Sequence, residues 1–200
     1  WLQTRYRTLH GVEQPGPEGN GWDREVWGLT AQDDVYLHLA LLAYNLDKEA
    51  LEELITRLNI KRDDADELRL LPELKKTLQQ LGKARRPSDV YRLLQPYPSR
   101  LLAVAWLATE RRKVRRQLLN YQKEWRLVEP ELTGDDLKAM GLKPGPLFGR
   151  LLRTLRNARL DGKVHTREEE VALVQKLLAA EARKSKSGES SSQQAHLPAR

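Results

Sequence analysis

The chain has 200 residues, a formal net charge of +7 at pH 7 and an isoelectric point near 9.7. It contains no cysteine, which excludes disulfides and thiolate metal sites, and no apolar run approaches the roughly 20 residues of a membrane span. The basic charge favours an acidic polymer as partner, and without a signal-peptide pattern we expect a cytoplasmic protein.

Residues 1–30 form a segment rich in glycine and proline, which oppose regular structure. Trp1, Tyr6, Trp22 and Trp27 lie in this segment. We expect their rings to fill gaps beside a core, with stacking on nucleic-acid bases as the alternative. Because the chain begins at Trp1 and its single methionine is Met140, we also expect it to be a fragment of a longer protein.

Residues 31–128 are predicted to form a helical body. Apolar residues recur every three or four positions in its first half, which is the period of one helix face. The predicted core positions are Val35, Leu39, Leu42, Leu46, Leu51, Leu54, Ile55 and Leu58. Asp47 and Asn59 suit helix ends, and prolines limit the next helices to about 73–81, 87–94 and 98–108. His38 has no second histidine nearby and is predicted to pack, not to bind metal.

Two basic elements follow in the body. The loop with Lys83, Arg85 and Arg86 is a weak phosphate-binding candidate. A helix predicted over about 110–128 has an apolar stripe, with Arg112 and Arg116 on the opposite face. At 1.5 Å per residue this helix is roughly 28 Å long, enough to follow several phosphates. A merely solvated polar face is the alternative interpretation.

Residues 129–183 are predicted to form a second helical region with a sharp corner. Thr133 suits the cap of a short helix that ends near Met140, where Gly141 can take a positive φ. The Lys-Pro-Gly-Pro sequence at 143–146 then turns the chain and starts a helix over about 146–160. An Asp-Gly turn at 161–162 precedes a capping box formed by Thr166 and Glu169. Residues 184–200 are rich in serine and glutamine, and we expect them to be disordered.

The corner is the main predicted binding site. On the helix that follows it, leucines gather on one face and arginines on the other. Glycines at the start of this helix would let an RNA backbone approach its free amides, which favour a phosphate. The predicted RNA-binding residues are Lys143, Gly145, Gly149, Arg150, Arg153 and Asn157, extended by Arg112 and Arg116. The alternative is a purely structural corner with solvated arginines.

The distribution of charge supports this choice. Residues 137–167 contain eight lysines and arginines against one acid, Asp161. Residues 33–67 have the opposite balance, with ten acids against four bases. A face that serves only solubility normally mixes both signs. The asymmetry therefore indicates that the basic half faces nucleic acid.

The motifs of this second region resemble a known family. A Thr-Gly pair at 133–134, an Asp-Leu pair at 136–137, a Pro-Gly-Pro corner at 144–146 and a Leu-Asp-Gly turn at 160–162 occur in this order before a helix with acidic residues. This series is similar to the C-terminal signature of class II tRNA nucleotidyltransferases, which include CCA-adding enzymes and bacterial poly(A) polymerases. The leucine-rich stretch at 31–70 resembles the helical body of these enzymes.

The resemblance implies an all-α body and tail without the catalytic head, with residues 1–30 as a truncated neck or linker. In the complete enzyme the head would bring Mg²⁺ and ATP or CTP to the reaction; for this chain the resemblance implies no cofactor, metal ligand or catalytic residue. Asp64 and Asp66 match the letters of the two catalytic aspartates of the head, but their context is helical and lacks a glycine turn. The implied partners are the acceptor and T-arm half of a tRNA and a head-containing polypeptide.

Two other functions stay open at this stage. A short helix, a glycine-containing corner and a second helix resemble the helix-hairpin-helix motif of DNA-binding proteins. A helical scaffold that binds only protein is the second alternative. The residues also leave open whether the parent enzyme adds CCA, A, CC or poly(A), because that choice lies in the head and neck.

Overall fold

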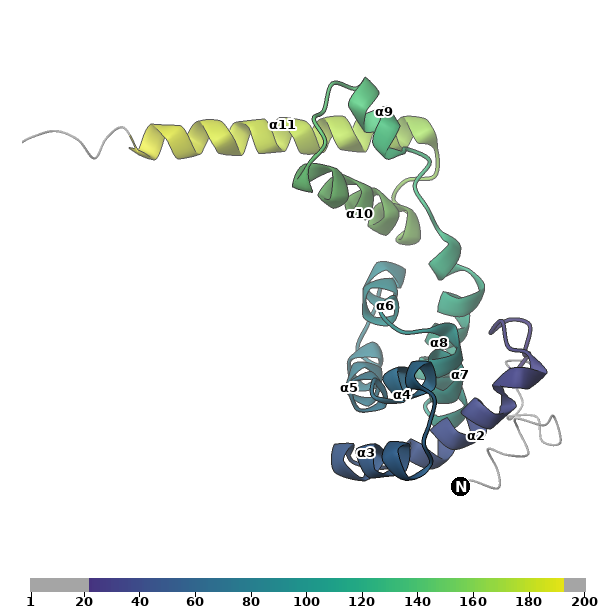
Figure 1. Cartoon of the computed structure of the whole chain (residues 1–200). Coiled ribbons are helices and arrows are strands. Elements are labelled where there is room, and N and C mark those ends of the chain that lie inside the picture. Colours follow the sequence, from purple (N-terminus) through teal and green to yellow (C-terminus); the bar gives the residue numbers. More distant parts are fainter. Residues whose placement is uncertain (1–21, 193–200) are drawn as a thin grey trace, which may run out of the picture. The chain divides into compact units, whose positions relative to one another are not determined.

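The computed structural model describes the backbone of residues 22–192 and the side chains of residues 22–181 and 183. All regular elements in this part of the chain are helices (Figure 1), which confirms the predicted all-α fold class. The chain divides into two compact units at Leu127 and Val128, one residue from the predicted boundary. In the described residues, no helix is both long and apolar enough to cross a membrane.

The first unit is built from short helices whose starts are set largely by proline and capping residues. Its elements are η1 (Ala31–Asp33), α2 (Asp34–Ala43), α3 (Lys48–Arg57), α4 (Arg62–Leu68), α5 (Leu71–Leu81), α6 (Pro87–Leu94), α7 (Ser99–Ala108), α8 (Arg112–Lys123) and η2 (Trp125–Leu127). Asp47 caps α3 by accepting a hydrogen bond from the amide of Ala50, and Asn59 follows α3 with a positive φ of 47°. The predicted helix over 110–128 is shorter than expected. Its α-helical part ends at Lys123 because the backbone of Glu124 leaves helical geometry, and a 3₁₀ turn carries Trp125 against the core.

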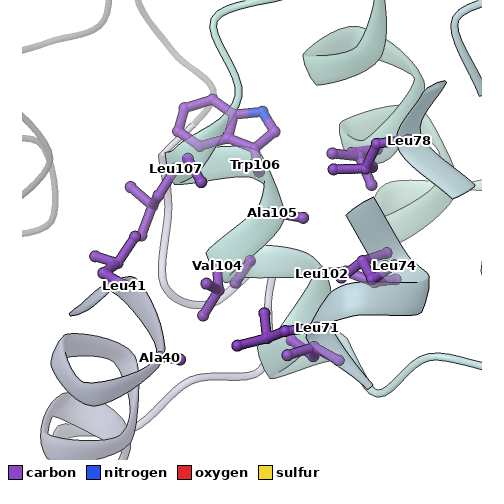
Figure 2. Packing of buried hydrophobic residues seen from close by; sticks show 14 of the residues in the cluster. Ala40, Leu41, Leu71, Leu74, Leu78, Leu102, Val104, Ala105, Trp106 and Leu107 are labelled. Carbon is purple, nitrogen blue, oxygen red and sulfur yellow. The ribbon is translucent and has the colours of Figure 1, made fainter. Parts of the chain in front are cut away.

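The core of this unit surrounds α7, in which every residue from Leu101 to Ala108 is buried. Figure 2 shows side chains of α7 between Ala40 and Leu41 of α2 on one side and leucines of α5 on the other. Trp22 and Trp27 pack on Trp106, with ring centroids 5.8 and 6.4 Å apart. These two tryptophans therefore fill space beside the core, as predicted. Trp1 and Tyr6 lie outside the described residues.

The predicted core face of α2 is wrong. Val35 and Leu42 are 78% and 58% exposed, whereas Leu37, Ala40 and Leu41 are buried. Leu58 of the next predicted stripe is also exposed, although Leu51 and Ile55 are buried as expected. The sequence of α2 is apolar on nearly all sides, so two stripes fit the helical period equally well. Packing against α7 selects the stripe that the spacing alone does not identify.

Charged residues of the acidic half form ion pairs within and between the helices of this unit. Asp64 and Asp66, which lie in α4, pair with Arg100 at 2.7 Å and with Arg69 at 2.9 Å. Their helical context is therefore as predicted, and their carboxylates serve ion pairs. The ring nitrogen Nδ1 of His38 lies 2.6 Å from the carbonyl oxygen of Asp34 in its own helix. The described residues contain no group of three side chains suited to hold a metal ion.

The second unit contains α9 (Gly134–Ala139), α10 (Pro146–Leu160) and α11 (Arg167–Ser192). Its buried core consists of Leu132, Leu137, Leu151, Leu155 and Val174. The predicted capping box of Thr166 and Glu169 is present at the start of α11. Thr133 caps α9 as predicted, and Asp136 completes a second capping box there that the sequence analysis did not predict.

The helix α11 continues to Ser192, into the segment for which disorder is expected from the sequence. No proline interrupts residues 184–192, and a helix that is already formed gains one hydrogen bond for each residue it adds. Residues 193–200 lie outside the described part.

Candidate nucleic-acid interface

The predicted corner has the expected backbone path. Gly141 takes a φ of 85° directly after α9, a conformation that side chains strongly disfavour. Gly145 is the N-cap of α10 and has extended backbone angles, so its conformation does not require glycine. No side chain caps this helix end, and the amide of Phe148 donates to the carbonyl of Gly145 at 3.0 Å. The first turn of α10 is therefore not covered by a capping side chain.

The eight basic residues of 137–167 are less available than their number suggests. Five of them pair with carboxylates, most of which lie just outside that window. These pairs are Lys138–Asp135, Arg150–Glu181, Arg156–Glu129, Arg159–Glu131 and Arg167–Asp136. Over residues 128–183 there are ten bases against nine acids. The excess of basic residues over 137–167 therefore depends on the limits of that range, because the acids that pair with them lie outside it.

The predicted residues on α10 share an exposed face. Arg150, Arg153 and Asn157 are exposed, and so is Gly149, where an added Cβ would meet nothing within 4 Å. The Nε of Arg153 donates to the carbonyl of Gly149 at 3.1 Å, while Arg150 makes only an open 3.6 Å pair with Glu181. Among the described residues, no carboxylate lies at ion-pair distance from Arg153. The outward face is as predicted, and its contact with RNA stays a prediction.

Lys143 is exposed in the loop before α10 and also has no ion-pair partner in the described part of the chain. It therefore adds one uncompensated charge to the corner. Arg112 and Arg116 lie on α8 in the first unit, so the structure places the predicted residues in two units.

The start of α8 carries an unusual concentration of positive charge. Arg111, Arg112 and Lys113 occupy its N-cap and first turn without an acid, although the positive end of a helix favours acids there. Arg111 donates to the carbonyl of Leu78 and Lys113 to that of Gly82, at the C-terminal end of α5. These two cations therefore have a structural role, because they complete the end of α5.

Other cations near α8 have no such role. Arg85, Arg112 and Arg116 are exposed, and no carboxylate of the described residues lies at ion-pair distance from them. Residues 83–127 contain twelve bases against three acids. The positive charge of the protein is therefore concentrated in the second half of the first unit. This concentration lies outside residues 137–167, and a count of charges over 83–127 in the sequence reveals it.

A cleft of about 410 Å³ lies beside these cations. It runs between residues 84–90 and α8, and its lining includes Arg85, Arg86, Lys113, Arg116, Gln117 and Trp125. The weak phosphate candidate at 83–86 and Arg116 of α8 thus line the same cleft, whereas Arg112 does not line it. Gln117 and Trp125 had been assigned no binding role from the sequence. Only the packing of α6 against α8 brings them to the same surface as Arg85.

Three carboxylates in the second unit have structural functions, of which only the capping box of Glu169 was predicted from the sequence. Glu170 is completely buried and accepts hydrogen bonds from the amides of Glu131 and Leu132. Asp136 accepts from the amide and hydroxyl of Thr133 and pairs with Arg167, and these contacts lower its pKa to about 2. The amides of His165 and Thr166 lower the pKa of Glu169. The acidic residues of the family-like motif therefore stabilise the corner.

Comparison with known proteins gives relatives of one kind. No protein-family profile matches the chain. An A-adding tRNA nucleotidyltransferase of Geobacter sulfurreducens is 27% identical over 157 residues, which are 78% of this chain and 16% of that protein. The chain thus spans less than a fifth of the length of this curated relative.

The solved structures that resemble the fold are CCA-adding enzymes. The Thermotoga maritima enzyme complexed with tRNA_CCA matches 88% of this chain and 40% of its own, with a TM-score of 0.63 and 20% identity. A CCA-adding enzyme in apo form II matches 90% of this chain and 39% of its own, with a TM-score of 0.62 and 20% identity. The predicted resemblance is thereby confirmed: in sequence and fold this chain is similar to part of the helical region of the tRNA nucleotidyltransferases.

Proposed function

We propose that this chain binds tRNA as a helical part of an enzyme that adds nucleotides to tRNA 3′ ends. The observation that carries the proposal is the group of exposed arginines Arg85, Arg112 and Arg116, which lack carboxylate partners in the described residues. A similar fold occurs in a CCA-adding enzyme solved with tRNA. The nucleotide chemistry itself, with Mg²⁺ and ATP or CTP, would belong to a catalytic head on another segment or polypeptide.

The chemistry of these side chains suits a phosphate backbone. A guanidinium group is always charged and matches the geometry of a phosphate with paired donors. An A-form RNA duplex offers proteins its phosphates, 2′-hydroxyls and shallow minor groove more readily than its deep major groove. Recognition of the acceptor and T-arm half of tRNA by shape and phosphate therefore needs few base-specific contacts. Lys143, Arg150, Arg153 and Asn157 would form a second set of contacts in the other unit.

The proposal is tested by changing Arg112 and Arg116 together to glutamine. Each lost phosphate contact lowers the slope of log affinity against log salt by roughly one. We expect weaker tRNA binding at 50 mM salt and a slope lower by about two, measured by fluorescence anisotropy with labelled tRNA. The matched control is Arg57→Gln with Arg62→Gln, which removes two exposed charges from the acidic half.

Two results would contradict the proposal. One is equal loss of affinity in the Arg112/Arg116 variant and in the control, because that would reflect only net charge. The other is tighter binding of duplex DNA than of tRNA in direct competition, which would favour the helix-hairpin-helix alternative. A helical scaffold that binds only protein would show no affinity for tRNA even at low salt.

A further inference from the structure

The cleft beside α8 contains a buried polar group that its own protein leaves partly unsatisfied. Gln117 is only 8% exposed and lines the cleft. Its Nε2 donates to the carbonyl of Ala84 at 3.3 Å, which fixes the direction of the amide, because the reversed amide would set two oxygens against each other. Its Oε1 has no hydrogen-bond partner among the described residues. A residue that lines the cleft therefore carries a buried acceptor without a hydrogen bond.

The rim of the cleft provides charge for an anion. Arg86 is held by two 3.1 Å hydrogen bonds to Asp89, and Lys113 donates to Gly82. Arg85 and Arg116 are exposed and have no carboxylate partner in the described part of the chain. These two guanidinium groups are consequently available to a phosphate at the mouth of the cleft.

The wall of the cleft provides an aromatic surface. Trp125 lines it from η2 and is only partly buried by the core. An indole face stacks on any nucleic-acid base, because every base has a flat π-surface. The volume of about 410 Å³ lies near the lower end of the range for sites that hold one small organic ligand. A flat ring with N–H donors, joined to a phosphate, matches all these features.

We propose that this cleft binds one unstacked nucleotide of the bound RNA. Its base would lie against Trp125 and donate an N–H to Oε1 of Gln117, and its phosphate would lie between Arg85 and Arg116. The inference rests on the proposed RNA-binding function and deepens it, because phosphate contacts alone do not require a cleft or a buried acceptor. All four bases carry an N–H donor, so the site is expected to tolerate different bases.

The test compares two RNA hairpins that differ by a single unpaired nucleotide. With the full chain, we expect the hairpin with the unpaired nucleotide to bind roughly tenfold more tightly than the fully paired one, as expected for one base stacked on an aromatic side chain. Gln117→Met and Trp125→Leu should reduce this preference to less than twofold while the paired hairpin binds within twofold of its original affinity. Arg85→Gln, a change at an exposed position, should also reduce the preference.

Gln122 provides a matched control on the same helix. It is 2% exposed, donates to the carbonyl of Val26 at 2.9 Å, and its Oε1 also lacks a partner in the described residues, but it does not line the cleft. Gln122→Met should therefore keep the tenfold preference. Circular dichroism of each variant checks that the helices are intact, and the exposed Arg85→Gln change keeps the test decisive if a buried variant fails to fold.

The possible outcomes separate this inference from the proposed function. Equal binding of both hairpins by the unaltered protein would overturn the nucleotide site while leaving salt-dependent RNA binding in place. Failure to bind either hairpin would overturn both. A titration with adenosine, guanosine, cytidine and uridine 5′-monophosphates tests whether the cleft binds free nucleotides in preference to a nucleotide within an RNA. Binding of any of them more tightly than the hairpin with the unpaired nucleotide would also overturn the proposal.

Discussion

The side-chain oxygen Oε1 of Glu170, a completely buried residue, lies 3.0 Å from Nε of Arg159. The same carboxylate accepts hydrogen bonds from the amides of Glu131 at 3.2 Å and Leu132 at 2.8 Å. Glu170 thereby ties α11 to α10 and to the segment that leads into α9. The orientation of the predicted binding corner depends on this carboxylate.

Removing Glu170 is expected to unfold the second unit selectively. Glu170→Ala leaves the amides of Glu131 and Leu132 without their acceptor, and a buried donor left unsatisfied costs about 1–3 kcal/mol. All five tryptophans lie at or before residue 125, so their fluorescence reports only on the first unit. Urea unfolding should therefore show an earlier loss of helicity by circular dichroism and an unchanged fluorescence transition.

Glu181→Ala is the control for this prediction. Its pair with Arg150 is 3.6 Å long and exposed, and such pairs contribute about 0–1 kcal/mol. A fluorescence transition that moves together with helicity in Glu170→Ala would show that the two units do not unfold separately.

Asp136 is expected to make the second unit sensitive to acid. Its pKa in the folded protein is about 2, below its ordinary value, because Thr133 donates to it and Arg167 pairs with it. A carboxyl group with a lowered folded pKa stabilises the fold above its unfolded pKa, near 4, and this contribution disappears as the pH falls toward 2. Asp136→Asn should lower the thermal midpoint at pH 7, and the difference from the unaltered protein should vanish near pH 2.

Asp135→Asn removes the same charge from the same turn and serves as the comparison. Asp135 makes only an exposed pair with Lys138. The thermal midpoint of the Asp135→Asn variant at pH 7, followed by circular dichroism, should fall by less than half as much as that of the Asp136→Asn variant. Equal shifts in the two variants would argue against the special role of the contacts around Asp136.

Two glycines of the corner are expected to respond in opposite directions to alanine. Gly141 has a φ of 85°, so Gly141→Ala should destabilise the second unit by about 1–2 kcal/mol. Gly149 lies inside α10 with open space at its Cβ position, so Gly149→Ala should stabilise the helix by about 0.5–1 kcal/mol. If RNA approaches the first turn of α10, Gly149→Ala should at the same time weaken tRNA binding. Greater stability with unchanged tRNA affinity would remove Gly149 from the binding site.

Arg150 and Arg153 are expected to contribute to tRNA affinity through phosphates. The double change to alanine should weaken binding and flatten its dependence on salt. The control is Lys138→Ala with Lys176→Ala, which removes two exposed charges from the other two helices of the same unit. Binding that is unchanged across a salt series would assign Arg150 and Arg153 to solvation alone.

The sequence by itself determined most helix starts, caps and turns, because these depend on residues within four positions of one another. Pro87 and Pro146 start helices where expected, and Gly141 ends one with the predicted positive φ. The motifs of the second region also indicated the resemblance to tRNA nucleotidyltransferases. Local sequence patterns predict these features because a helix forms its backbone hydrogen bonds between residues of the same segment.

Only the tertiary structure decided which faces are buried and which charges are free. The spacing in α2 allowed two apolar stripes, and packing on α7 selected the one that leaves Val35 exposed. Carboxylates distant in sequence pair with Arg156, Arg159 and Arg167, so the basic count overstated the charge at the corner. Charge compensation and clefts depend on distances in space between residues far apart in the chain, and the order of residues does not contain those distances until the helices pack.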